Sequence, residues 1–129
     1  MSTTITPELS RKNKYYISKH RYYELKHFCL QYPEWKYQMV TLGGVMRNAN
    51  LIEDPTGETA TKLADLKSKI ALIRKLAMES DKDLASYIFK AVTEERTYEN
   101  LKTFFDIPCS RDMYYDRYRK FFWLLDKER

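Results

Sequence analysis

Apolar residues recur along the chain at intervals of three and four positions, which is the period of an amphipathic α-helix. The pattern predicts helices over residues 13–32, 34–42, 54–79, 82–93, 98–105 and 110–125. Only three Gly and four Pro residues interrupt the chain, which disfavours a turn-rich β fold. We therefore expect an all-α protein, a small helical bundle. Residues 1–53 are expected to form a basic, tyrosine-rich helical segment, and residues 54–129 a helical domain.

The longest predicted helix, residues 54–79, follows the start signal Asp54-Pro55-Thr56. Its apolar residues are spaced like the a and d positions of a heptad repeat: Leu63, Leu66, Ile70, Ile73 and Ala77. Such a stripe packs either in the core of a bundle or against a second copy in a homodimer. A bundle core is the commoner explanation.

The segment before this helix contains two predicted interruptions. Pro33 is expected to end the first helix, because proline cannot extend a helix that precedes it. The pair Gly43-Gly44 is expected to break or loosen the second, which carries Trp35, Met39 and Leu42 inward. Residues 45–53 then form a connector.

The stretch from Thr97 to Leu125 predicts two helices with a tight break between them. Thr97 and Ser110 are the expected N-cap residues, and Asp106 tolerates the left-handed conformation that a tight break requires. Leu101, Phe104 and Phe105 form one apolar face of the short helix, and Ile107 is a buried residue of the break. The apolar face of the longer helix comprises Tyr114, Tyr118, Phe121, Phe122 and Leu125.

This arrangement over residues 97–125 is typical of a helix-turn-helix, in which the second helix enters the major groove of DNA. Residues near the start of that helix then meet base edges: Ser110, Arg111, Asp112 and Tyr115. The alternative is a plain helical hairpin without a DNA-binding role, since the motif has no invariant residue.

The formal net charge is +5, and residues 1–50 alone carry a net +5. Basic residues alternate there with tyrosines, a pattern found on surfaces that follow a phosphate backbone, with Lys14, Lys19 and Arg21 as the candidate contacts. The alternative is an ordinary amphipathic helix with solvated lysines. Residues 98–129 carry a net charge of only +1.

No catalytic pattern is found in the sequence, so we expect a binding protein rather than an enzyme. His20 and His27 have no third ligand nearby, and we expect neither a metal nor a cofactor. Cys29 and Cys109 lie far apart, which indicates reduced thiols in the cytoplasm. No signal peptide or membrane-spanning run is found, so we expect no membrane partner.

Three short motifs occur in a fixed order: Tyr22-Tyr23-Glu24-Leu25, then Asp54-Pro55-Thr56, then Ser110-Arg111-Asp112-Met113-Tyr114-Tyr115. In this order the chain resembles the phage-encoded transcriptional regulators of the RinA and ArpU type, whose C-terminal part is similar to the helix-turn-helix of sigma factor region four. The resemblance implies a phage or prophage regulator of late genes that contacts duplex DNA and host RNA polymerase. Asp116 stands where that family often has Arg, which leaves Arg111, Arg117 and Arg119 as the implied DNA contacts.

The main hypothesis is therefore a sequence-specific transcriptional regulator. The alternative is a small phage protein that binds and modulates a host protein through its aromatic and basic surface, anchored by Tyr15, Tyr22, Tyr115 and Trp123. A packaging subunit that binds DNA as a ring is a third hypothesis, and it predicts a large oligomer.

Overall fold

The protein is all-α, as the sequence predicts. The computed structural model describes the backbone of residues 12–52 and 57–129, and the side chains of residues 12–43 and 57–129. Within these residues it contains six helices and no strand: α1 (Lys19–Leu30), α2 (Tyr32–Ile52), α3 (Gly57–Ser80), α4 (Ala85–Glu94), α5 (Tyr98–Phe105) and α6 (Arg111–Glu128). The expected start signals at residues 6–8 and 54–56 lie outside the described residues.

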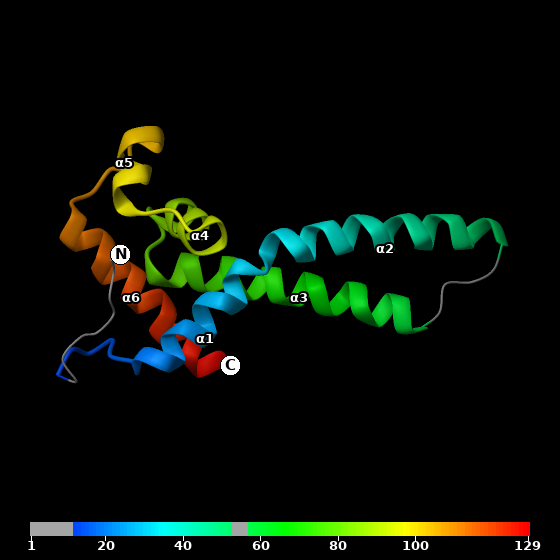
Figure 1. Cartoon of the computed structure of the whole chain (residues 1–129), viewed down its shortest axis with the longest axis horizontal. Coiled ribbons are helices and arrows are strands. Elements are labelled where there is room, and N and C mark those ends of the chain that lie inside the picture. The colour runs from blue at the N-terminus through cyan, green and yellow to red at the C-terminus, as the bar shows by residue number, and fades with distance from the viewer. Residues whose placement is uncertain (1–11, 53–56) are drawn as a thin grey trace.

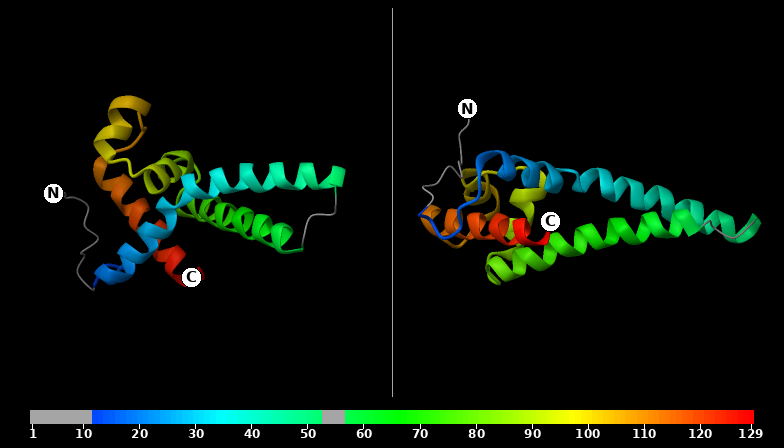
Figure 2. Two further views of the ribbon diagram at one scale, coloured as in Figure 1. Left: turned by 45° about the vertical axis from the view of Figure 1, so that its right-hand side comes forward. Right: turned by 90° about the horizontal axis from the view of Figure 1, so that it is seen from below.

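The molecule has a helical head and a projecting arm. Helices α2 and α3 run antiparallel side by side and extend away from the other four helices (Figures 1 and 2). We call this pair the arm. Helices α1, α4, α5 and α6 form the head. In it, α4 and α6 pack against the C-terminal half of α3, α1 packs against α4 and α6, and α5 packs against α4.

One continuous hydrophobic core fills the head and extends into the arm. All five residues of the predicted apolar face of α6 are buried, as are Leu25 and Cys29 of α1 and Ile88 and Val92 of α4. In α3, Leu66, Ile73 and Ala77 are buried in the same core, and Ile70 packs against it. The heptad-like stripe of α3 therefore serves the chain's own bundle core, which was the commoner of its two interpretations.

Two predictions about the region of α2 are wrong. Pro33 does not end a helix but lies in the first turn of α2, where a missing N–H breaks no hydrogen bond. The pair Gly43-Gly44 does not break α2, which continues to Ile52. Two helical glycines cost about 2 kcal/mol in propensity. Packing of Trp35, which is buried, and of Met39 and Leu42 against the core offsets that cost.

Helix α1 begins later than predicted, at Lys19 rather than near Asn13. The Asn13 side chain accepts a hydrogen bond from the backbone N–H of Tyr15 at 2.8 Å, and its carbonyl accepts one from Tyr16 at 3.0 Å. These bonds form a local turn that competes with the helix. The chain before α1 still contributes Ile17, which is buried, to the core.

No helix in the described part of the chain combines the length and the apolar character needed to cross a membrane.

Candidate nucleic-acid interface

The connection between α5 and α6 has the local geometry that the sequence predicts. The Thr97 hydroxyl accepts a hydrogen bond from the backbone N–H of Asn100 at 3.1 Å, and the Ser110 hydroxyl accepts one from that of Met113 at 3.2 Å. Asp106 is left-handed, with φ 50° and ψ 50°, and ends α5. Both N-caps and the left-handed Asp106 are thus confirmed.

Two further bonds hold the chain between the helices. Ile107 is fully buried, and its backbone N–H donates to the Leu101 carbonyl at 3.3 Å. The Tyr98 hydroxyl donates to the Cys109 carbonyl at 2.7 Å. The break is therefore a fixed turn. One prediction is wrong: Phe104 is 70% exposed rather than part of the inward face of α5.

The predicted base-reading residues lie in the first turns of α6. Ser110, Arg111 and Asp112 are exposed, and Tyr115 is half-buried. Arg111 forms an ion pair with Glu99 of α5, and its guanidinium carbon lies 5.2 Å from the centre of the Tyr115 ring. The structure therefore brings these residues together on an accessible surface, with Arg111 already engaged.

The residues that lead into α6 include more acids than bases. Residues 97–116 contain four carboxylates and two cations: Glu99, Asp106, Asp112, Asp116, Lys102 and Arg111. Acids in the first turn stabilise a helix, because they face the positive end of its dipole. They also repel phosphates, so this end of α6 offers side chains for recognition but little electrostatic attraction for DNA.

Arg117 connects two parts of the head. Its Nε donates to Asp81 Oδ2 at 2.9 Å, and its guanidinium also pairs with Asp116. The other Asp81 oxygen accepts from the backbone N–H groups of Asp83 at 2.9 Å and Leu84 at 3.1 Å. Burial raises the pKa of Asp81, but the bonds from Arg117 and these N–H groups outweigh it and leave the pKa below its ordinary value. Arg117 thus joins α6 to the turn before α4.

Arg119 also lies against the protein. The residue is half-buried, and its Nε is buried without a hydrogen-bond partner in the described structure. Arg117 and Arg119, the DNA contacts implied by the family resemblance, are thus less accessible than Arg111.

The N-terminal cations lie at the other end of α6. Arg21 donates from Nε to Asp126 at 2.6 Å and pairs with Glu24 at 3.3 Å. Its pKa is raised, mainly by the hydrogen bond to Asp126. Asp126 and Arg111 are about 22 Å apart along α6, at about 1.5 Å per residue. Lys14 and Lys19 are exposed near the start of α1, so the two predicted groups of contacts do not form one cluster.

A second basic surface comes from residues that the sequence did not single out. Four cations and three aromatic rings make a continuous row from the start of α2 over α3 and α4 to the end of α5, and we call it the basic–aromatic row. Its members, in spatial order, are Lys36, Tyr32, Arg74, Phe89, Lys90, Phe105 and Arg96.

The contacts in this row are direct. Arg74 donates to the Tyr32 hydroxyl at 3.4 Å, and its guanidinium carbon lies 4.3 Å from the Phe89 ring centre. Lys90 and Arg96 each lie 4.9 Å from the centre of the Phe105 ring. Phe105 immediately precedes the turn between α5 and α6, so the row reaches the helix-turn-helix candidate.

The row borders a groove of about 560 Å³ that is lined by Lys36, Arg74 and Lys90, among others. Among the described residues these three cations have no carboxylate partner, whereas Glu94, which also lines the groove, pairs with Arg96 at 2.6 Å. Cations over aromatic rings suit a phosphate backbone, and three of the four cations in the row have no carboxylate partner among the described residues. No local spacing in the sequence links these positions, because four helices contribute them.

No protein family, curated protein or solved structure matches the chain. Within the described part of the chain, no group of three or more His, Cys, Asp and Glu side chains is placed to hold a metal ion. The chain is therefore characterised by its own geometry: a two-helix arm, a helical head, a capped turn before α6 and a basic–aromatic row.

Proposed function

We propose that the protein is a phage or prophage transcriptional regulator of the RinA and ArpU type that binds duplex DNA in the cytoplasm of the bacterial host. The observation that carries this proposal is the fixed turn between α5 and α6, which leaves the first turn of α6 exposed. Ser110, Arg111 and Asp112 meet base edges there, and Tyr115 borders them. Host RNA polymerase is the expected protein partner.

The basic–aromatic row supports the same function by supplying phosphate contacts. The acidic start of α6 attracts DNA weakly, so the attraction comes from the cations Lys36, Arg74 and Lys90, which have no carboxylate partner among the described residues. Exposed ion pairs contribute only about 0–1 kcal/mol. Arg111 therefore exchanges Glu99 for a guanine edge or a phosphate at small cost.

Variants of Arg111 and Lys36 test this division of roles. Arg111→Ala should reduce the preference for the specific duplex over a scrambled one, because an Arg–guanine contact is worth about 1–3 kcal/mol. Lys36→Gln should weaken both duplexes equally, because Lys36 belongs to the basic–aromatic row that supplies the phosphate contacts. Fluorescence anisotropy measures both affinities. Unchanged affinity and preference for Arg111→Ala would show that α6 does not read the bases.

A second candidate function is a module that binds and modulates a host protein. The observation in its favour is the set of exposed apolar side chains, of which Tyr37 is 74%, Val40 72% and Phe104 70% exposed. The predicted anchors already contact the chain itself. Tyr22 is buried, and the rings of Tyr15 and Trp123 pack together with their centres 5.4 Å apart. Binding of a host protein that survives high salt, without duplex binding at low salt, would favour this function.

A further inference from the structure

One side of the arm carries a row of alternating charge. Glu58, Lys62, Asp65 and Lys69 follow one another at spacings of four, three and four, which places all four on one face of α3. Glu58, Lys62 and Asp65 are exposed, and Lys69 is half-buried. Within the chain, Asp65 and Lys69 pair at 3.2 Å. The sign therefore alternates along the row as minus, plus, minus, plus.

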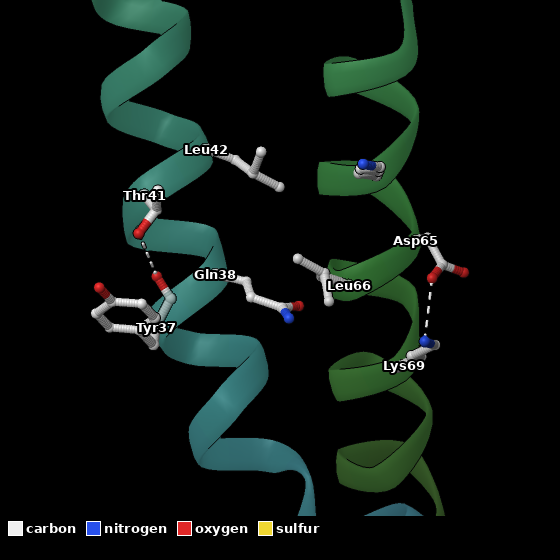
Figure 3. Close-up of a pocket in the computed structure, with 8 residues that line it drawn as sticks. Tyr37, Gln38, Thr41, Leu42, Asp65, Leu66 and Lys69 are labelled. Carbon is white, nitrogen blue, oxygen red and sulfur yellow. Dashed lines mark hydrogen bonds and ion pairs between the residues drawn. The ribbon is translucent and has the colours of Figure 1, made fainter.

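This charged row borders a groove of about 420 Å³ between α2 and α3. Figure 3 shows Leu42 and Leu66 pointing toward each other across the groove, with Tyr37 and Thr41 on the α2 side. Leu66 is buried, whereas Tyr37 is 74% exposed. The face thus combines an apolar groove, an exposed aromatic ring and charges of both signs, as a protein-binding surface does.

We propose that this face binds a second copy of the chain, with the two α3 helices antiparallel across a two-fold axis. An axis level with the midpoint between Lys62 and Asp65 places Glu58 opposite the second copy's Lys69. It also places Lys62 opposite the second copy's Asp65. By symmetry, all four charged positions of each copy then meet the opposite sign, and exposed Tyr37 lies on the interface side of the arm.

Other placements of the second copy lose this complementarity. A parallel arrangement in register sets each charge against its own kind. An antiparallel register shifted by one helical turn leaves at least two of the four positions without an opposite charge.

The expected contact is small. The two α3 helices overlap over residues 57–70, about 20 Å at about 1.5 Å per residue. With two helices side by side, the face covers roughly 400 Å² per copy, about half of a standard interface. The dimer should therefore be weak and depend on concentration and salt, as a transient assembly does.

The test is sedimentation velocity of the full chain at low salt, from about 10 µM to about 500 µM. We expect a monomer–dimer equilibrium. Lys62→Glu and Asp65→Lys each place like charges together twice in a symmetric dimer, so each should raise the dimer dissociation constant roughly tenfold or more. Lys67→Glu is the matched control, because Lys67 is exposed on the opposite side of α3.

Mixing the two single variants, Lys62→Glu and Asp65→Lys, gives the decisive result. In a mixed dimer the two substituted positions face each other with opposite charges, and so do the unchanged Asp65 of one copy and the unchanged Lys62 of the other. Dimerisation should therefore return only in the mixture. Three results would overturn the proposal: a monomer at every concentration, equal effects of Lys67→Glu and Lys62→Glu, or no rescue on mixing. None of these results depends on DNA binding, so they leave the proposed function untouched.

Discussion

At the scale of single residues, Asp81 shows how one side chain joins two elements. Its carboxylate binds Arg117 of α6 and two backbone N–H groups at the start of α4. Asp81→Asn should lower the free energy of unfolding by about 1–3 kcal/mol, because it removes a charge-assisted bond. Urea unfolding at pH 7 measures this. Asp83→Asn is the control, since the Asp83 side chain is exposed, and an equal effect of both variants would contradict the assignment.

The same carboxylate predicts a pH dependence in acid. The pKa of Asp81 in the folded protein lies below its ordinary value. Its contribution to stability is therefore complete above the ordinary aspartate pKa of about 4 and is lost as the pH falls through the lower folded value. The difference in stability between the wild type and Asp81→Asn should shrink from pH 7 to pH 3. If the difference in stability between the wild type and Asp81→Asn stays constant from pH 7 to pH 3, the charge of Asp81 is not its cause.

The buried hydroxyl pair of Tyr22 and Tyr118 predicts a pH dependence in base. Their oxygens lie 2.8 Å apart. Burial raises the pKa of Tyr22 to about 12 and that of Tyr118 well above its ordinary value. The resulting stability is complete below the unfolded pKa of about 10 and is lost as the pH rises through the folded values.

Thermal unfolding from pH 8 to pH 11 measures this loss. Tyr22→Phe should be less stable at pH 8 by about 1–3 kcal/mol, because the Tyr118 hydroxyl loses its buried partner. The double variant Tyr22→Phe, Tyr118→Phe should lose less than twice that amount. Tyr37→Phe, at an exposed position, is the control. Full additivity of the two single variants would contradict the pairing.

At the scale of elements, the sequence predicts best where the signals are local. The caps Thr97 and Ser110, the left-handed Asp106 and the buried Ile107 all follow from neighbouring residues, so α5 and α6 lie where the sequence predicts them. The predicted break of α2 at Gly43-Gly44 is wrong, because helix propensity does not include the packing against α3 that keeps α2 helical.

The cap of α6 gives a prediction at this scale. Ser110→Ala should lower the free energy of unfolding by about 1 kcal/mol, because the backbone N–H of Met113 loses its acceptor. Chemical unfolding followed by circular dichroism measures this loss. Ser86→Ala, an exposed serine inside α4, should leave stability equal or slightly higher. A stable Ser110→Ala variant would mean that water replaces the cap.

At the scale of the whole molecule, the contacts that matter come from distant parts of the chain. The distribution of charge along the sequence favours Lys14 and Lys19, but the structure places them away from the first turn of α6. The basic–aromatic row could not be predicted, since its members meet only once α2, α3, α4 and α5 have packed together. The sequence identifies basic and aromatic residues as candidate phosphate contacts. The packing of the four helices determines which of them lie together.

The row makes a prediction that separates phosphate attraction from base reading. Arg74→Gln should weaken all duplexes and reduce the slope of log affinity against log salt by about 1, because one phosphate contact is lost. Lys62→Gln removes the same charge from a different face of α3, beside the other groove, and is the control. Anisotropy titrations at several salt concentrations measure the slope. Equal slopes for both variants would exclude the row as a DNA contact.

The most direct test of duplex DNA binding is a binding measurement on the full chain with duplex fragments of the genome that encodes it, at about 50 and 200 mM salt. The proposed function predicts selective binding to some fragments, with affinity that falls steeply between the two salt concentrations because phosphate contacts release counterions. Binding to no fragment at the lower salt concentration would contradict the proposed function and favour the protein-binding module.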